Sequence, residues 1–395
     1  MLAYIAPIFV FGIVVFVHEL GHFLAAKAVG VYTPRFSIGF GKALWRKRWG
    51  ETEYVIAALP IGGYVRMASK DDEATAFLEG GSENAATRVA PNGEPLDPDA
   101  MMPFGPKPIP SDRWFESKPL PARLMILLAG VTMNILLSFV VMTGMFSYYG
   151  SPYLSTTADS LFADRAGAKA GLQKGDSIVA IAGSPVDWEA LVTKVSASPG
   201  IPLAFDIVRD GQRRQLMVTP AADTATNPST GKIDSVGRIG ILPVQRTRPV
   251  GFGQAVTSGW TTTWRMAGSV IDALKGLATR KVSASQLGGP IMIAQASVQA
   301  ARGGVEQLLF LIALISANLA VFNLLPIPIL DGGQIVIGLL EGLKGSAFSM
   351  RTREYILRAG LFAVLLLFAL VTYNDIRRLV LSVVQGLERR RELSL

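Results

Sequence analysis

The sequence predicts an α-helical polytopic membrane protein with about four transmembrane helices, a membrane-associated β element and an inserted α+β domain. Half of the 395 residues are hydrophobic and only 17% are charged, whereas soluble globular chains carry about 25% charged residues. Several apolar stretches approach or exceed the length of a membrane helix, which needs about 20 residues. Between two of these stretches the composition changes to that of a small soluble domain.

The net charge of +8 does not indicate a nucleic-acid partner. Lys and Arg cluster beside the apolar stretches, in "KALWRKRWG" and "LERRREL", where basic side chains anchor membrane ends and face anionic headgroups. Membrane lipid is therefore the expected partner of these charges. The chain has no cysteine, which excludes thiol nucleophiles, thiolate metal sites and disulfides.

The first apolar stretch, residues 1–26, is expected to be a retained transmembrane helix. It has no Lys or Arg before Lys27 and no convincing small-residue cleavage site after it, so it does not read as a signal peptide. Cleavage would also remove the motif HELGH.

The remaining elements are read from composition in chain order. They are a β region at 27–68, a polar Pro/Gly-rich loop at 69–121, the second transmembrane helix at 122–148, the soluble domain at 155–248, an amphipathic helix and connector at 251–304, the third and broken transmembrane helix at 305–340, the fourth at 356–378 and a basic tail at 379–395.

Two of these segments have local patterns that predict their structure. In the soluble domain, Ser177–Ile181 reads as a strand, "WEALVTKVSA" as a helix, and Asp210-Gly211 as the turn of a hairpin. From residue 252, apolar residues recur mostly every three or four positions. That period predicts an amphipathic helix in the membrane interface, with a soluble core helix as the alternative.

His18 and His22 are the only histidines, and both fall in one HExxH motif with Glu19 between them. On a helix, positions four apart share one face. Two imidazoles at this spacing can hold Zn²⁺ jointly while the glutamate acts on the attacking water. Ionisable groups in a membrane segment are costly unless they are paired or ligated, which favours the metal site over a chance match.

Zinc hydrolases usually supply three protein ligands. With no further histidine and no cysteine, the third ligand is expected to be Asp331, in "FNLLPIPILDGG". Glu341 and Asp375 lie at predicted span ends, where a solvated or snorkelling role explains them.

The prolines beside Asp331 predict irregular backbone at membrane depth. Pro326 and Pro328 prevent a continuous helix, and such backbone is tolerated only where it lines a cavity or is covered by protein. We expect Pro326, Pro328 and Leu330 to hold substrate backbone, and Asn323 to grip an extended peptide. Capping of the broken helix is the alternative role for Asn323.

A second substrate-binding segment is expected in "EYVIAALPIGGYVRM". It can supply a strand edge for an unwound substrate, with Gly62 and Gly63 allowing the turn and Tyr64 beside them; an ordinary hairpin is the alternative. Asn134, a polar residue in the second span, either bonds across helices for packing or lies near the catalytic chamber.

These residues together resemble the site-2 proteases, intramembrane zinc metalloproteases, and specifically their bacterial regulator of sigma-E protease type. The similar stretches are "HELGHFLAAK", "RFSIGFGKALWR", "TEYVIAALPIGGYV", "AGLQKGDSIVAI", "LGGPIMIAQ" and "NLLPIPILDGG". They occur in the family's order over nearly the whole chain.

The resemblance implies a bacterial inner-membrane zinc endopeptidase that cuts single-span substrates within the membrane. It assigns zinc to His18, His22 and Asp331, and the base to Glu19. It also implies that the β region is membrane-reentrant and that residues 155–248 form a periplasmic PDZ domain, with residues 27–121 on the cytoplasmic side. Pre-cleaved anti-sigma factors and remnant signal peptides are the substrates it suggests, and the PDZ domain can bind a peptide or protein.

The sequence departs from the family in three places. The best-known members carry two PDZ domains, whereas this chain has room for one; the 69–121 segment is longer than the family's linker; and Gln334 follows DGG where His is frequent. Two other functions stay open at this stage. One is a membrane-anchored zinc endopeptidase acting on soluble or interfacial peptides, and the other is a non-catalytic PDZ adaptor with a structural zinc.

Overall fold

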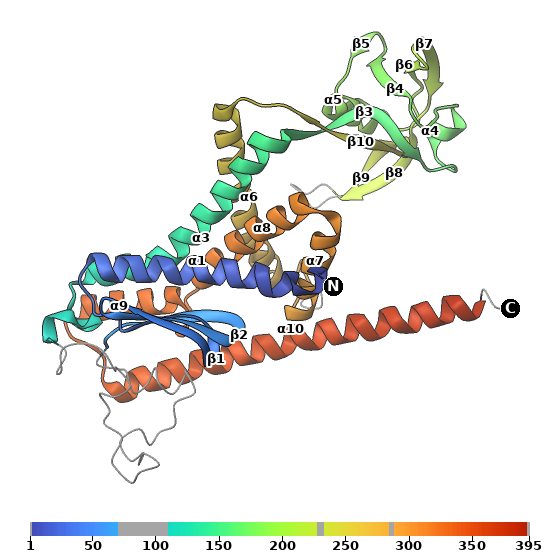
Figure 1. Cartoon of the computed structure of the whole chain (residues 1–395). Helices are drawn as coiled ribbons and strands as arrows, with labels where there is room; N and C mark the ends of the chain where they lie inside the picture. The colour runs from blue at the N-terminus through green and yellow to red at the C-terminus, as the bar shows by residue number, and fades with distance from the viewer. Residues whose placement is uncertain (1, 70–109, 227–232, 284–287, 393–395) are drawn as a thin grey trace. The chain divides into compact units, whose positions relative to one another are not determined.

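A computed structural model describes residues 2–69, 110–226, 233–283 and 288–392 (Figure 1). The chain divides into two compact units. One comprises Met1–Met145 with Val256–Leu395, and the other comprises Phe146–Ala255. We call them the membrane unit and the inserted unit.

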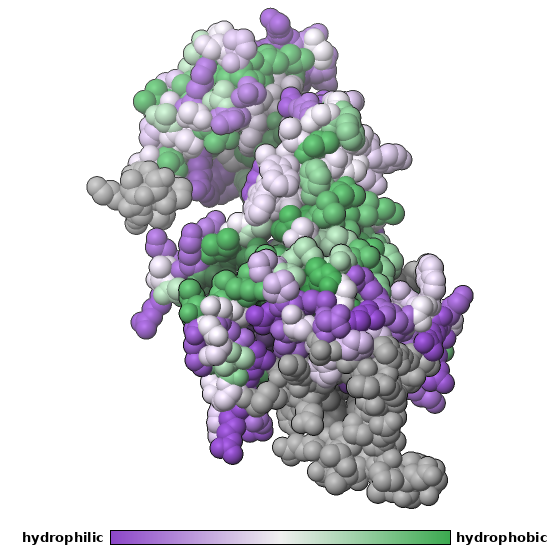
Figure 2. Space-filling model, turned by 90° about the vertical axis from the view of Figure 1, so that its left-hand side faces the viewer, coloured by the Kyte–Doolittle hydropathy of each residue, from purple (hydrophilic) through white to green (hydrophobic). Residues whose placement is uncertain are grey.

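Four helices in the described part of the chain are long and apolar enough to cross a membrane, as the sequence predicts. Figure 2 shows hydrophobic residues gathered in a broad band over the membrane unit. The four helices are α1 (Ala6–Ala28, preceded by the short η1, Leu2–Ile5), α3 (Leu120–Tyr149), α8 (Val305–Asn323) and α10 (Met350–Glu392).

Helix α1 packs against two of the other spans. Val10 and Val14 form a buried cluster with Ile312 of α8. At the other end of α1, Gly21 lies against α3 so closely that a Cβ on it would be 2.4 Å from the carbonyl oxygen of Ala129. Small residues allow such close helix crossings in membranes, so the glycine of HELGH fixes how near α3 comes to the two histidines.

The predicted β region forms a sheet from two long, bent strands, β1 (Arg35–Trp49) and β2 (Thr52–Arg66). Residues 35–38 have register partners both at 53–56 and at 63–66, because β2 bends back on itself. The ring of Phe36 packs against Phe16 and Phe23 of α1. This packing places the second half of β2 beside the HELGH turn of α1.

The predicted loop 69–121 is described only in part, since residues 70–109 lie outside the described residues. Its last part is ordered into two short turns, η4 (Ser111–Arg113) and η5 (Phe115–Ser117). Arg113 donates two hydrogen bonds of 2.8 Å to Glu51 at the tip of the β1–β2 hairpin, and Lys27 pairs with the same carboxylate at 2.6 Å. These hydrogen bonds, that of Arg113 first, lower the pKa of Glu51 to about 2.

Residues 251–304 contain two helices, α6 (Phe252–Ala278) and α7 (Pro290–Gly303). Within the membrane unit, α6 runs antiparallel to α3. Ser138 contacts Thr263 at 3.4 Å, and a Cβ on Gly259 would be 2.3 Å from Oγ1 of Thr143. The position of α6 in the membrane interface stays a prediction.

The inserted unit is a small α+β domain. It contains β3 (Ser151–Leu161), α4 (Ala166–Lys169), β4 (Ser177–Ile181), β5 (Ser184–Pro185), α5 (Trp188–Ser196), β6 (Leu203–Arg209), β7 (Gln212–Val218), β8 (Ala221–Thr226), β9 (Ile233–Arg238) and β10 (Ile241–Arg248).

The main sheet of this unit has the order β10-β3-β4-β6-β7, and β8 pairs with β9. The strand at Ser177–Ile181, the helix after it and the hairpin at Asp210-Gly211 are confirmed. Both turn residues have positive φ, as a two-residue hairpin turn requires. Inside the domain, Asp176 accepts hydrogen bonds from the Arg209 side chain and from the backbone N–H of Gln173. Burial raises the pKa of Asp176, but these bonds outweigh burial and hold it below its ordinary value.

Candidate metal centre

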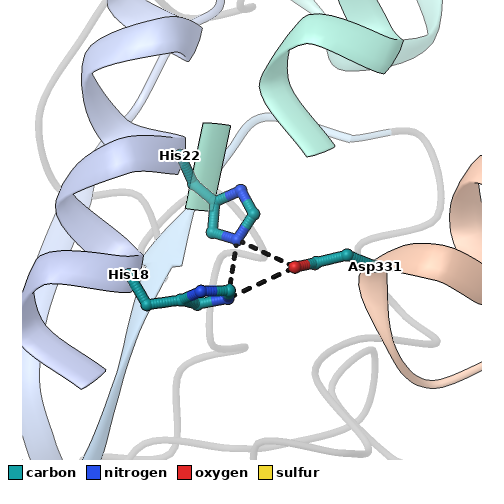
Figure 3. A group of neighbouring side chains, drawn as sticks. All are labelled: His18, His22 and Asp331. Carbon is teal, nitrogen blue, oxygen red and sulfur yellow. Dashed lines mark hydrogen bonds and ion pairs between the residues drawn. The ribbon is translucent and has the colours of Figure 1, made fainter. Parts of the chain in front are cut away.

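The side chains of His18, His22 and Asp331 converge on one point of the membrane unit (Figure 3). Oδ2 of Asp331 lies 3.2 Å from Nε2 of His18 and 3.5 Å from Nε2 of His22, and the two Nε2 atoms are 3.1 Å apart. This is the group of metal-binding side chains found in the described part of the chain. The sequence predicts that two histidines and an aspartate more than 300 positions away bind one metal ion, and the structure brings the three side chains together.

The break in the helix before α9 (Asp331–Lys344) positions the carboxylate of Asp331 at the site. Helix α8 ends at Asn323, and the segment with Pro326 and Pro328 separates it from α9. The two glycines after Asp331 lie against this segment, where added Cβ atoms would be 2.2 Å and 2.1 Å from backbone oxygens. The DGG motif is therefore needed for α9 to fold back tightly enough to aim Asp331 at α1.

The hydrogen bonds around the three residues fit a bound cation. Nδ1 of His22 donates to the carbonyl oxygen of Ile126 at 2.8 Å, which leaves a lone pair on Nε2. Oδ2 of Asp331 is buried, and among the described residues it accepts no hydrogen bond. Lone pairs that converge in a buried place call for a positive charge between them. Two imidazoles and one carboxylate form a donor set of catalytic zinc sites, which leave a further position for water.

Gly130 of α3 is a site residue that the sequence reasoning missed. A Cβ at this position would lie 2.3 Å from Nε2 of His22 and 2.8 Å from Cε1 of His18. The absence of a side chain here is what makes room for the site. The available signal was its spacing, four residues before Asn134 and four after Ile126 on the same helix face.

Glu19 lies between the two histidines and accepts a hydrogen bond from the backbone nitrogen of Val65 at 3.2 Å. The same strand brings Gly63 close, where a Cβ would be 3.5 Å from Cγ of Glu19. These contacts place the second half of β2 directly beside the Glu19 carboxylate.

The two asparagines predicted near the site both contact His18. The amide nitrogen of Asn323 lies 3.0 Å from Nε2, and that of Asn134 lies 3.3 Å from Nδ1. The Asn323 side chain thus contacts the histidine rather than the end of its own helix. Asn134 is fully buried, and of its two predicted roles the structure favours a place beside the chamber.

The other predicted substrate-binding residues lie around these groups. Gln334, which stands where a histidine is frequent in the family, donates to the carbonyl oxygen of Pro328 at 2.7 Å. This hydrogen bond stabilises the segment between α8 and α9. Leu330 precedes α9 with an extended backbone. Pro326 lies in the same break.

Gly62 and Gly63, predicted to allow a turn, lie in β2 where it bends back so that residues 63–66 return to residues 35–38. Gly62 has φ +101°, and a Cβ there would be 2.5 Å from the ring of Phe40, which stacks on Tyr64 at 6.0 Å. Gly63 has no room for a side chain either, since a Cβ would be 2.7 Å from the oxygen of Ser37.

The interpretation of Glu341 and Asp375 as solvated residues is wrong. Glu341 is 5% exposed and accepts hydrogen bonds from Arg353, the shortest 2.7 Å. Asp375 is 3% exposed and accepts from the backbone nitrogens of Gly289 and Met292, each at 3.0 Å. It caps the start of α7 from α10, and neither carboxylate belongs to the metal centre.

The chain is similar to known proteins over most of its length. The sequence model described as Peptidase family M50 matches residues 6–367. A zinc metalloprotease RasP of Bacillus licheniformis is 31% identical, over 95% of this chain and 99% of the relative. The regulator of sigma-W protease RasP of Bacillus subtilis is 30% identical over 95% and 99%. The regulator of sigma E protease of Salmonella typhi is 31% identical over 95% and 98%.

Proposed function

Because this chain belongs to peptidase family M50, we propose that it is a zinc metalloprotease that hydrolyses peptide bonds within the transmembrane segments of single-span proteins. The observation that carries the proposal is the placement of the metal centre. Two of its three residues lie on α1, which is long and apolar enough to span a membrane, and the third follows a break after another such helix.

His18, His22 and Asp331 would hold the zinc ion, whose chemistry when bound is to lower the pKa of a water molecule and to polarise a carbonyl group. Glu19 would take the proton from the attacking water and pass it to the leaving amine. Its hydrogen bond with Val65 holds the carboxylate beside the strand edge, where the scissile bond of an extended substrate would lie.

The second half of β2 would bind the substrate as an added strand. A transmembrane helix hides its peptide bonds within its own hydrogen bonds, so it must be unwound before hydrolysis. The edge at Gly63–Val65 offers backbone groups for this, and Asn323 and the Pro326–Leu330 segment would hold the other side. Gly62 and Tyr64 would shape this edge through Phe40.

The inserted unit would act as a PDZ domain. Strand β10 is at the edge of its sheet, and a groove of about 570 Å³ lies along α5. Its apolar lining includes Phe162, Trp188, Leu191, Val195, Ile239 and Ile241. An edge strand beside an apolar groove suits a bound peptide, or the domain could exclude substrates with large ectodomains.

We further propose that the protein is a multi-pass protein of the bacterial inner membrane with the PDZ domain in the periplasm. Two of its relatives are named as regulators of sigma-W and sigma-E, which makes pre-cleaved anti-sigma factors the first substrates to test, with remnant signal peptides second.

The rival protease function differs in where the cut falls. A zinc endopeptidase acting on soluble or interfacial peptides would cut outside the hydrophobic segment. The non-catalytic adaptor is disfavoured because Glu19 lies at the site without being one of the converging ligands, and a structural zinc has no need of it.

The test uses purified protein in detergent and a reporter with one transmembrane helix, with and without a chelator, with the cut mapped by mass spectrometry. We expect a metal-dependent cut inside the hydrophobic segment. Glu19→Gln should retain zinc and lose cleavage, and full activity in that variant would refute the mechanism. A cut outside the segment would support the rival protease.

A further inference from the structure

The two histidines of the metal centre receive different support at their second ring nitrogens. Nδ1 of His22 faces a backbone carbonyl, that of Ile126, at 2.8 Å. Nδ1 of His18 faces a side chain, the amide of Asn134, at 3.3 Å. Both supports come from α3, eight residues apart, with Gly130 midway between them.

Metal binding through Nε2 sets a condition on Nδ1. In a neutral imidazole one nitrogen carries the proton and the other the lone pair. Nε2 of His18 faces Asp331 and His22 across the metal site, and the amide nitrogen of Asn323, a donor, lies 3.0 Å from it. Metal binding therefore needs the lone pair on Nε2 and the proton on Nδ1. A protonated Nδ1 in a buried site needs an acceptor. For His22 the carbonyl of Ile126 meets this need.

The amide of Asn134 can meet the same need for His18. The amide oxygen and nitrogen exchange places by a half-turn about one bond, and the hydrogen-bond network decides between the two orientations. With the nitrogen toward His18, Oδ1 of Asn134 is buried without a partner among the described residues. An amide nitrogen facing a protonated Nδ1 would set two donors against each other, whereas the amide oxygen in that place accepts the Nδ1–H that metal binding requires.

We propose that Asn134 is a positioning residue that accepts a hydrogen bond from Nδ1–H of His18 and thereby holds its Nε2 lone pair toward the metal. The inference rests on the proposed zinc site and deepens it. Asn134 is 0% exposed, and its backbone oxygen accepts a hydrogen bond from Ser316 of α8 at 2.9 Å. Asn134 is thus a buried residue of α3 that contacts α1 through its side chain and α8 through its backbone.

The hydrogen-bond acceptor of His18 is therefore sensitive to mutation, and that of His22 is not. No side-chain substitution removes the Ile126 carbonyl, whereas a single change at position 134 removes the acceptor for His18. Loss of such a partner of a ligating histidine typically lowers metal affinity by about 10- to 100-fold.

The first experiment compares zinc affinities by competition with a chelator, using the full chain in detergent. Asn134→Leu keeps the approximate size but removes the acceptor, and we expect affinity to fall about 10- to 100-fold. Asn134→Asp keeps an oxygen acceptor and should bind zinc at least as tightly as the unmodified chain. Ser138→Ala, another buried polar residue one turn further along α3, is the matched control and should bind normally.

The second experiment reads the ring directly and needs neither zinc nor activity. The chain has only two histidines, so ¹⁵N-histidine labelling gives two rings, assigned with a His22→Gln variant. At a pH where the rings are neutral, we expect the proton of His18 on Nδ1 in the unmodified metal-free protein, and a shift toward Nε2–H in Asn134→Leu.

The outcomes separate this inference from the proposed function. A proton on Nε2 of His18 in the unmodified metal-free protein would overturn the inference, even if Asn134→Leu fails to fold. Unchanged zinc affinity in a folded Asn134→Leu would also overturn it, as would equal losses in Asn134→Leu and Asn134→Asp. If the unmodified chain binds no zinc, the proposed function fails, while the ring measurement still tests Asn134.

Discussion

The strongest quantitative prediction concerns Gly130, because a single methyl group there would occupy the metal centre. Gly130→Ala places a Cβ 2.3 Å from Nε2 of His22 and 2.8 Å from Cε1 of His18. Non-bonded heavy atoms settle at about 3.5 Å or more, so the His22 nitrogen would have to move by about 1 Å. The nearer contact is with Nε2, the atom of His22 that would bind the metal.

A shift of this size exceeds what a zinc site accommodates. Ligand distances in such sites vary by about 0.2 Å, and His22 is also held at Nδ1 by Ile126. We therefore expect zinc affinity to fall at least 100-fold, more than the usual loss of an outer partner. Replacing glycine by alanine favours a helix by roughly 0.5–1 kcal/mol, so the metal-free protein should not be globally destabilised unless α3 itself moves.

The assay is zinc content and affinity by chelator competition, with thermal unfolding of the metal-free protein measured in parallel. Gly144→Ala is the matched control, since it lies on the same helix and a Cβ there meets nothing within 4 Å. We expect this control to keep zinc and activity. Zinc affinity within threefold of the unmodified chain in Gly130→Ala would refute the geometry of the site.

Two predictions concern the carboxylates outside the site. Asp375→Ala removes the acceptor for two N–H groups at the start of α7 and should lower the free energy of unfolding in detergent by about 1–3 kcal/mol. The control, Asp272→Ala at an exposed position, should change this free energy by less than about 0.5 kcal/mol. Equal effects of the two substitutions would contradict the capping role. The pKa of Glu51 is lowered from 4.5 to about 2, so its carboxylate stabilises the fold above about pH 4.5, and this contribution is lost as pH falls toward about 2. Near pH 6 the free energy of unfolding of the unmodified chain should exceed that of Glu51→Gln by about 1 kcal/mol. Thermal unfolding at a series of pH values should show this difference shrinking between about pH 4.5 and 2. A difference that grows on acidification would refute the ion pair.

The metal-binding residues could be predicted from the sequence because the chain offers so few alternatives. It has two histidines, both in one motif, and no cysteine. A carboxylate beside two prolines and two glycines in an apolar stretch was the remaining choice, and Asp331 lies within 3.5 Å of both imidazoles. Scarcity of ligands, more than the motif alone, decided the prediction.

The supports of the site could not be predicted in the same way. Gly130 reads as an ordinary member of an apolar helix, and for Asn134 the sequence leaves open both packing across helices and a place near the chamber. What distinguishes them is their distance from residues more than 100 positions away. That distance depends on the crossing of α1 and α3, which no local pattern contains.

The misreading of Glu341 and Asp375 has a related cause. Position near a span end predicts a solvated carboxylate, and this rule holds only when nothing else satisfies the group. Arg353 is 12 residues from Glu341, and the α7 amides are more than 80 residues from Asp375. Both partners are set by tertiary packing, so both residues became buried and structural.

The β region shows how much a strand pattern leaves open. The sequence predicted strands at 27–68, and β1 and β2 are there. It did not predict that residues 35–38 pair with two parts of β2. That pairing needs close backbone approaches, which the glycines at 39 and 63 permit, and it brings Val65 to Glu19.

The arrangement of supports implies that α3 shapes the metal centre although it supplies no ligand. Ile126, Gly130 and Asn134 follow one another every four residues, so they form one stripe along the helix. In order, they offer an acceptor for His22, the space for both rings, and an amide for His18. A stripe of this kind works only if α3 keeps its distance from α1, and that distance is set where Gly21 meets Ala129. A side chain at Gly21 would push all three supports away together, so the glycine between the two histidines of HELGH belongs to the construction of the site as much as the histidines do.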